Sequence, residues 1–207
     1  MEGYLLKTKM RGPDAQQVVE TEFGYLGFAR LAIMGVTPDG MQPFQRDGSW
    51  VICNGEIYGF RKIKKELEER GYQFQSGSDC EVLLPLYEEY GLEMFSHLDA
   101  EYACVLYDHK SGKLIAARDQ IGIRPLFYGY SKSGKIAFAS EAKNLIGWVD
   151  EVRAFPPGSY YYDGKFVKYE DIAAVHGYVH EDIDVITKNI HDKLTEGVKK
   201  RLDADAP

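Results

Sequence analysis

The sequence predicts a layered α+β domain in which antiparallel hairpins outnumber helices. Three pairs of strand-like segments are each separated by a short turn, at residues 109–112, 132–134 and 163–164. Helical periodicity is confined to a few other segments. Hairpins build antiparallel sheets, and a sheet must bury one face against another layer. Sheets and helices are therefore expected to stack as layers.

The strand segments follow one another along most of the chain. Apolar runs over residues 23–34 and 49–54 predict the first two strands. The remaining strands form hairpins, which pair 102–108 with 113–119, 125–131 with 135–141, and the two arms of 159–169. Sheets should therefore supply most of the framework.

Helical segments are expected in four places, at residues 60–70, at about 79–90, from Glu141 and at 182–202. In the first of these, Phe60, Ile63 and Leu67 recur at helical spacing and share one face. Gly71 follows as a natural C-terminal stop. This helix should therefore pack its apolar face on a sheet.

The start of the second helix carries two structural signals. Ser78 and Glu81 have the spacing of a capping box, which predicts that their side chains cap the helix. Asp79 lies in the first turn, where the helix dipole favours a carboxylate, so a purely structural role is one alternative for it. Pro85 lies farther along, where proline removes a helical hydrogen bond, and we expect a kink there.

Composition limits the classes of function. The chain has 207 residues, 44% of them hydrophobic, which suits one large domain or a domain with an appendage. A net charge of −7 argues against partners such as nucleic acid or an anionic membrane surface. No apolar stretch approaches the about 18 residues of a membrane span, and the start does not resemble a signal peptide. The three dispersed cysteines form no zinc or disulfide pattern, so we expect a reducing cytoplasm.

The stretch Asn54-Gly55-Glu56 ends an apolar strand and precedes the helix at 60–70. Asn-Gly is a strong hairpin signal, so a simple turn is one interpretation. No returning strand follows it, however. We therefore expect Asn54 and Gly55 at a strand-to-helix junction, where backbone and side-chain amides often face a ligand.

A resemblance to a known family depends on eight short motifs that occur in one order. They are RGPD (11–14), FARLAIMG (28–35), QPF (42–44), NGEIY (54–58), SGSDCEVLL (76–84), AARDQIGIRPLFYG (116–129), FASEAKNLI (138–146) and FPPGSYY (155–161). Together they resemble the glutamine-hydrolysing domain of asparagine synthetase, a class II glutamine amidotransferase, over about residues 8–170. The resemblance implies an N-terminal-nucleophile (Ntn) hydrolase fold, a four-layer α/β/β/α sandwich with two antiparallel sheets.

The resemblance also implies roles for the site residues. In this family an N-terminal cysteine, with its own α-amine as base, attacks the side-chain amide of glutamine. The Asn54 side-chain amide and the Gly55 backbone N–H would form the oxyanion hole. Arg30 would bind the α-carboxylate of glutamine, while Asp79 and Glu56 would receive its α-ammonium.

Structural alternatives stand beside these roles. Arg30 could be a surface charge at a strand edge, and Glu56 a charge in the first turn of a helix. We interpret Arg118, Asp119 and Arg124 as structural residues that hold the second hairpin, because no catalytic role of the family maps onto them. The cysteines Cys53, Cys80 and Cys104 are interpreted as buried and inert.

The sequence departs from the family at its N-terminus. The family begins with Cys-Gly-Ile and runs through a strand and loop before the helix that ends at the RGPD motif. Only ten residues precede Arg11 here, so we expect the nucleophile and the first strand to be absent and the chain to be inactive as given. A true start upstream is the preferred explanation, and a degenerate gene is the alternative.

The C-terminal part is expected to differ from the rest. We assign residues 1–170 to the amidotransferase domain and 171–207 to a linker and the first helix of an absent synthetase domain. ATP and Mg are expected only in that absent domain, and this chain should bind no cofactor. Aliphatic residues repeat at helical spacing along the last helix, at Ile183, Ile186, Ile190, Leu194, Val198 and Leu202. This stripe could pack on the sandwich, but we favour an unpartnered helix that self-associates into a homodimer.

The sequence therefore predicts the glutaminase domain of a glutamine-hydrolysing asparagine synthetase, which releases ammonia for the amidation of aspartate. The expected partners are glutamine and the synthetase domain of the full-length protein, with no nucleic acid and no membrane. The alternative is a non-catalytic amidotransferase-like module that binds an amino acid or another protein.

Overall fold

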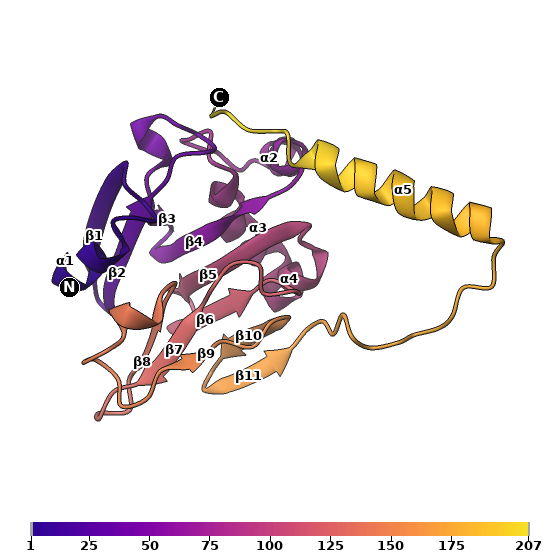
Figure 1. Ribbon diagram of the computed structural model, residues 1–207. Coiled ribbons are helices and arrows are strands. Elements are labelled where there is room, and N and C mark those ends of the chain that lie inside the picture. The colour runs from indigo at the N-terminus through magenta and orange to yellow at the C-terminus, as the bar shows by residue number, and fades with distance from the viewer. Residues whose placement is uncertain (1, 207) are drawn as a thin grey trace.

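The computed structural model describes residues 2–206 and shows an α+β sandwich (Figure 1). Its main sheet is antiparallel and has six strands in the order β11-β10-β6-β5-β4-β3. These strands are β3 (Phe44–Arg46), β4 (Ser49–Ile57), β5 (Ala100–Asp108), β6 (Lys113–Arg118), β10 (Ser159–Tyr162) and β11 (Lys165–Lys168). The long pairing of β4 with β5 forms the middle of the molecule.

Two smaller sheets complete the strand framework. One pairs β1 (Ala15–Thr21) with β2 (Gly24–Arg30), and the other has the order β8-β7-β9. The strands of the latter are β7 (Phe127–Tyr130), β8 (Ile136–Ala139) and β9 (Arg153–Ala154). All three predicted hairpins are confirmed, as β5–β6, β7–β8 and β10–β11.

The helices are short except for two. The α-helices are α1 (Glu2–Leu5), α2 (Phe60–Glu69), α3 (Leu83–Tyr90), α4 (Met94–His97) and α5 (Ile183–Lys200). Single 3-10 turns occur at η1 (Leu6–Thr8), η2 (Pro38–Gly40), η3 (Asp79–Val82), η4 (Gly91–Glu93) and η5 (Ala142–Asn144). Within residues 2–206, none of these helices combines the length and the apolar character that crossing a bilayer requires.

The main sheet buries both of its faces, because successive side chains of a strand point to opposite sides. On one side, Cys53 and Ile57 of β4 pack with Phe60 of α2 and with residues of α3 and α4. On the other side, Val105 of β5 packs with Phe155 and with residues of β7 and β8. The central strands therefore lie between a helical layer and a second sheet layer.

The position of Asn54 and Gly55 corrects the sequence prediction. Both residues lie inside β4, where they pair with Ala103 and Tyr102 of β5, and not at a strand-to-helix junction. The strand continues to Ile57 because β5 offers a partner at each of these positions. The chain turns only afterwards, at Gly59, whose φ of 70° suits glycine before α2 begins.

The helix predicted at about 79–90 is also different in detail. It is divided into η3 and α3, so Pro85 is the third residue of α3 and its missing N–H removes no helical bond. The expected kink is therefore not needed. The capping box is wrong as well, because the Ser78 side chain caps nothing. The Glu81 carboxylate instead accepts hydrogen bonds from the backbone N–H groups of Gln75 and Ser76.

The loop between β6 and β7 is built around a buried carboxylate. Asp119 is 2% exposed, and its two oxygens accept hydrogen bonds from the backbone N–H groups of residues 121–124 at 2.6–3.1 Å. The neighbouring Arg118 donates to the carbonyl oxygens of Gly122, Arg124 and Phe155. These contacts are structural, as the sequence predicted for both residues.

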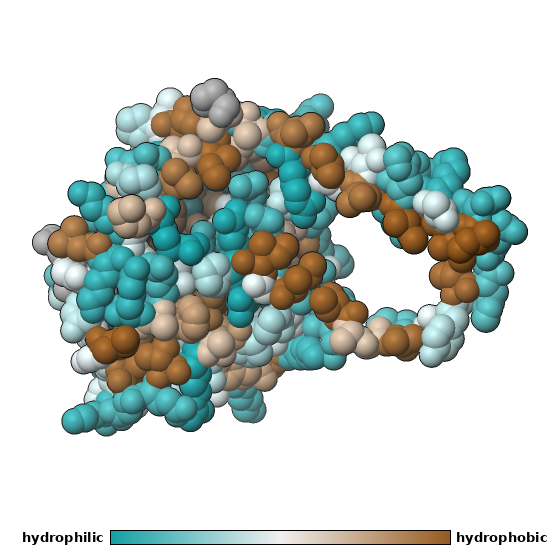
Figure 2. Space-filling view, in the orientation of Figure 1, coloured by the Kyte–Doolittle hydropathy of each residue, from teal (hydrophilic) through white to brown (hydrophobic). Residues whose placement is uncertain are grey.

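The C-terminal helix extends away from the sandwich and is joined to β11 by residues 169–182, which hold no helix or strand (Figure 1). Most of its apolar stripe is exposed, including Ile183, Ile190, Leu194 and Val198. Figure 2 shows hydrophobic side chains along the edge of the helix that borders an opening in the molecule. Within the described residues, therefore, the stripe does not pack on the sandwich.

We predict that Asp119→Ala lowers the free energy of unfolding by about 3 kcal/mol, because four buried or half-buried backbone N–H groups lose a charged acceptor. Urea unfolding measures the loss. Asp192→Ala is the control, since this exposed carboxylate pairs only with Lys188 on α5 and should contribute less than about 0.5 kcal/mol. Equal, small losses in the two variants would contradict the structural role of Asp119.

Candidate functional site

The candidate site forms along an edge of β4 that, within residues 2–206, no strand covers beyond Val51. The neighbouring strand β3 pairs only with Ser49–Val51, so the backbone beyond Val51 is met by side chains. The Gln42 side chain accepts from the Cys53 N–H at 2.7 Å and donates to the Cys53 carbonyl at 3.1 Å. Farther along, the Asp79 carboxylate accepts from the Ile57 N–H at 2.8 Å. We call this the uncovered edge of β4.

Gly55 lies midway between these two contacts. Backbone N–H groups of alternate residues point to the same edge of a strand, so the N–H of Gly55 points the same way as those of Cys53 and Ile57. Among residues 2–206, no acceptor bonds to it. A backbone donor is therefore available at the position that the family resemblance assigns to the oxyanion hole.

The preceding residue offers a second unused donor. The Asn54 side-chain nitrogen Nδ2 is buried and has no hydrogen-bond partner in the part of the chain that the structure describes. Native proteins rarely leave a buried donor unpaired, so such a group calls for a ligand or water. Two consecutive residues thus present amide donors without an acceptor.

Gly55 is also required by packing. A Cβ atom at this position would lie 2.3 Å from the Glu101 carbonyl oxygen and 2.7 Å from the Tyr102 Cα. Any side chain would therefore separate β4 from β5. Packing between the two strands therefore requires glycine at position 55, whatever chemistry the site performs.

Arg30 ends β2 and is buried, with only 7% of its surface exposed. Its guanidinium donates to the carbonyl oxygens of Thr37, at 2.9 Å, and Gly35. The alternative of an exposed surface charge is therefore wrong. A guanidinium has five N–H donors, so two bonds to the loop leave capacity for a carboxylate.

The loop at Gly35 connects Arg30 with Asp79. Gly35 has a φ of 55°, and a Cβ there would lie 2.5 Å from the backbone nitrogen of Ser78. The loop that holds the Arg30 guanidinium therefore packs directly on the residue before Asp79. Asp79 in turn bonds to β4 two residues beyond Gly55. A series of contacts therefore links the loop at Arg30, Asp79 and β4.

Asp79 is a buried carboxylate with 4% exposure. Burial raises its pKa above the ordinary value, although hydrogen bonds from the backbone N–H groups of Ile57 and Cys80 partly oppose this. Its ionised form is therefore unfavourable without a cation. This environment goes beyond a helix-dipole role, because Asp79 begins only a four-residue 3-10 turn.

Glu56 lies in β4 and not in a helix, so the alternative of a first-turn helix charge is wrong. Its carboxylate pairs with the Arg124 guanidinium at 3.4 Å, and Glu101 pairs with the same group at 2.6 Å. Burial raises the pKa of Glu56, while Arg124 lowers it and the carboxylates of Glu101 and Asp79 raise it further. The negative charge of Glu56 is therefore already balanced in part by the Arg124 guanidinium.

Sequence reasoning missed the part that Arg124 and Glu101 play here. Arg124 was interpreted as support for a hairpin, but it neutralises two carboxylates on adjacent strands. Glu101 lies directly opposite Glu56 in the β4–β5 register. The cluster becomes apparent only when the pairing register of β4 and β5 is known. That register cannot be deduced from either segment alone.

Asp79 and Glu56 line a small cavity together with Met34 and Tyr58, and with Lys200 and Asp203 from the C-terminal segment. Its volume is about 10 Å³, close to the space of one water molecule. Within residues 2–206, no group of three or more acidic, histidine or cysteine side chains is arranged to hold a metal ion. Of the predicted site residues, Asp79 and Glu56 share this cavity, whereas Arg30, Asn54 and Gly55 are not among the described residues that line it.

The cysteines Cys53, Cys80 and Cys104 are free and buried, as predicted. The Cys80 sulfur lies 3.8 Å from the Gly55 carbonyl oxygen, close to the candidate oxyanion hole. Its hydrogen bond with Cys53 and its burial raise the pKa of the Cys80 thiol well above the usual value. Cys80 is therefore protonated at neutral pH and a poor nucleophile.

Comparisons with known proteins agree with this geometry. A family model described as "Glutamine amidotransferase domain" matches residues 1–164. The chain is 40% identical to a probable glutamine-hydrolysing asparagine synthetase of Acanthamoeba polyphaga mimivirus, over 96% of this chain and 41% of that protein. It is 34% identical to asparagine synthetase B of Escherichia coli (strain K12), over 95% of this chain and 36% of that protein. The chain thus spans about two-fifths of these relatives.

A solved structure supports the fold. The glutamine phosphoribosylpyrophosphate amidotransferase from B. subtilis superposes with a TM-score of 0.59 and 25% identity, over 71% of this chain and 35% of that one. This neighbour is an Ntn amidotransferase, which confirms the predicted fold class. The chain therefore belongs to the class II glutamine amidotransferase family, and its relatives include glutamine-hydrolysing asparagine synthetases.

Proposed function

We propose that this chain binds glutamine as the glutaminase part of a glutamine-hydrolysing asparagine synthetase. The observation that carries the proposal is the pair of unused donors at Asn54 and Gly55, connected by contacts to the buried Asp79. The similarity to asparagine synthetases over nearly the whole chain supports the same assignment.

The charges of the site suit a free amino acid. Arg30 would bind the α-carboxylate, because its guanidinium is held in place by loop carbonyls and keeps further donors. Asp79 would receive the α-ammonium, with Glu56 beside it. The ammonium would supply the positive charge that the buried Asp79 carboxylate needs.

Hydrolysis would use the two amide donors. When a nucleophile attacks the side-chain carbonyl of glutamine, its oxygen becomes an anion, which Asn54 Nδ2 and the Gly55 N–H would stabilise. In this family the thiol of an N-terminal cysteine attacks, and its α-amine passes the thiol proton to the amide nitrogen as the carbon–nitrogen bond breaks and ammonia leaves. Water then hydrolyses the thioester, which releases glutamate and restores the thiol. The synthetase domain of the full-length protein would transfer that ammonia to aspartate.

A non-catalytic binding module is the second candidate. The observation that favours it is the burial of all three cysteines of this polypeptide. Such a module would bind glutamine without hydrolysing it. An assay of hydrolysis therefore distinguishes the two candidates, whereas a measurement of affinity does not.

Binding of L-glutamine by the 207-residue chain, measured by calorimetry, tests the proposal. We predict that Asp79→Asn weakens binding about tenfold or more, because the ammonium loses a charged hydrogen-bond partner. The amide keeps an oxygen that can accept from the Ile57 N–H. Loss of affinity with an intact fold therefore reports on charge. Absence of binding to the unmodified chain would contradict the proposed function.

The same variant should be more stable than the unmodified chain at pH 7 without ligand. The pKa of Asp79 is raised on folding, so its ionised form opposes folding above that pKa. Asparagine removes this penalty. As the pH falls through the folded-state pKa, Asp79 becomes neutral and the advantage of the variant should disappear, which thermal unfolding at a series of pH values would detect.

We predict that the isolated 207-residue chain releases no glutamate from glutamine above the rate in buffer. The three thiols, Cys53, Cys80 and Cys104, are buried, and the lack of an accessible nucleophile lowers turnover by as much as about 10⁶-fold. Cys80→Ser is the matched variant, since the Cys80 sulfur lies 3.8 Å from the Gly55 carbonyl oxygen. Turnover that survives repurification and disappears in this variant would show that Cys80 attacks.

We also infer that the apolar stripe of α5 packs on further protein surface, with the synthetase domain as its natural partner. For the isolated chain we predict a homodimer, because burying each large aliphatic side chain contributes roughly 1.5–3 kcal/mol. Light scattering should give twice the chain mass, and Ile190→Glu with Leu194→Glu should restore a monomer, since both side chains are exposed. A monomeric unmodified chain would contradict self-association.

A further inference from the structure

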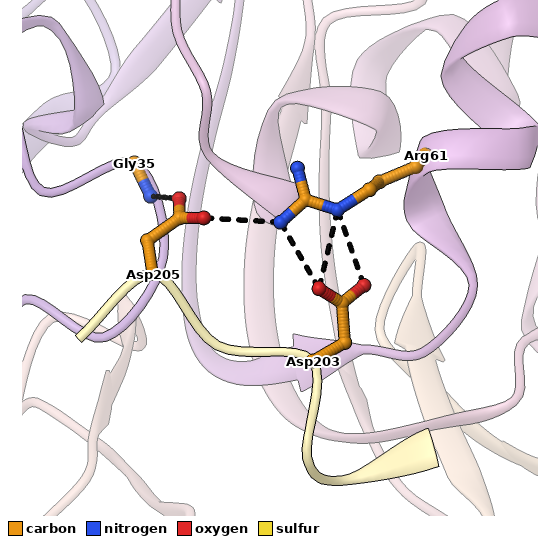
Figure 3. A network of polar contacts seen from close by, with 4 residues as sticks. All are labelled: Gly35, Arg61, Asp203 and Asp205. Atoms are coloured by element: carbon orange, nitrogen blue, oxygen red, sulfur yellow. Dashed lines mark hydrogen bonds and ion pairs between the residues drawn. The ribbon is translucent and has the colours of Figure 1, made fainter. Parts of the chain in front are cut away.

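The segment after α5 returns to the sandwich beside the candidate site. Figure 3 shows that two aspartates of this segment, Asp203 and Asp205, face the same arginine, Arg61 of α2. The Arg61 guanidinium donates to Asp203 at 3.0–3.2 Å and to Asp205 at 3.0 Å. Both aspartates therefore pair with α2, Asp203 through both of its oxygens and Asp205 through one.

They differ in what else they contact. One oxygen of Asp205 accepts from the Gly35 N–H at 2.8 Å (Figure 3). The backbone N–H groups of Asp205 and Ala206 donate to the Ile33 carbonyl at 3.1 and 3.0 Å. Within the described residues, the side-chain hydrogen bonds of Asp203 go to Arg61 alone. Only Asp205 therefore holds the loop around Gly35.

Both backbone polar groups of Gly35 bond to charged side chains. Its N–H donates to Asp205, and its carbonyl oxygen accepts from the Arg30 guanidinium. The loop cannot shift toward Asp79, because the Gly35 Cα already packs on Gly77 and Ser78. Asp205 and Arg30 thus hold one glycine from its two polar groups, and the position of that glycine determines where Arg30 points.

The bond to Gly35 matters more than the ion pair with Arg61. Arg61 and Asp203 are about half exposed, at 53% and 46%, and exposed ion pairs contribute little to stability. The bond from the Gly35 N–H to a carboxylate is partly buried, and a charged acceptor makes it stronger than a neutral one. Most hydrogen bonds of Arg61 go to Asp203, and it contributes one bond to the Asp205 carboxylate.

We propose that Asp205 is a positioning residue for the amino-acid site, which fixes Arg30 through the Gly35 loop and so couples the segment after α5 to glutamine binding. Its effect on glutamine rests on the proposed function. The coupling between Asp205 and the loop does not, because it follows from the contacts of the chain itself.

The test compares three variants of the 207-residue chain by two measurements. The variants are Asp205→Ala, Asp205→Asn and the matched control Asp203→Ala. The first measurement is hydrogen exchange, followed by mass spectrometry, of peptides that cover residues 31–40. The second is the dissociation constant for L-glutamine from calorimetry. Thermal unfolding verifies that each variant is folded.

We expect Asp205→Ala to speed exchange in this loop and to weaken glutamine binding about tenfold, the size of losing one hydrogen bond to a charged group. Asp205→Asn should rescue both within about threefold, because its side-chain oxygen can still accept from Gly35. Asp203→Ala serves as the control for exchange alone, because Asp203 also lines the cavity beside Asp79. It should change exchange by no more than about twofold, since it loses a half-exposed ion pair.

The outcomes separate the two proposals. Unchanged exchange in Asp205→Ala, an equal effect of Asp203→Ala on exchange, or tighter glutamine binding without Asp205 would overturn the positioning role. Faster exchange only in Asp205→Ala supports the coupling whether or not glutamine binds. If exchange is faster in Asp205→Ala but the unmodified chain binds no glutamine, the proposed function fails while the structural coupling stands.

Discussion

The uncovered edge of β4 is the constraint on which the candidate site depends. A strand inside a sheet normally has both of its backbone edges paired, but β3 pairs with β4 only as far as Val51. Gln42 and Asp79 each take over one position of the missing strand, at Cys53 and Ile57. These contacts connect two loops to the sheet, and they leave the N–H of Gly55 between them without an acceptor. The incomplete pairing of β4 thus leaves the Gly55 N–H available within the described residues and places a loop on each side of it.

Charge at this edge is unbalanced in a way that favours a cationic ligand group. Asp79, Glu56 and Glu101 lie close together, and Arg124 pairs with two of them. Burial raises the pKa of both Asp79 and Glu56, so the folded chain bears an electrostatic penalty while they are ionised. A bound ammonium would reduce that penalty. Functional sites commonly carry such a cost to stability.

Local patterns predicted the hairpins, α2 and α5, because each depends on periodicity or turn residues within a short segment. They failed where a distant partner decides the structure. Asn54 and Gly55 belong to β4 because β5 pairs with them, and Glu81 leaves its expected cap because Ser76 offers donors. Family resemblance supplied the role of Arg30, but neither resemblance nor pattern could show that loop carbonyls hold its guanidinium.

The segment after α5 connects an exposed surface with the candidate site over a very short distance. Leu202 continues the apolar stripe of α5 and is 75% exposed, while Asp205, three residues later, holds Gly35. Coupling between two binding events is reciprocal in free energy. If a ligand at Arg30 stabilises the Gly35 loop, it must also stabilise the docked segment by the same amount. A protein surface that packs on the stripe and a ligand at Arg30 would then favour one another, with Gly35 as the residue through which both act.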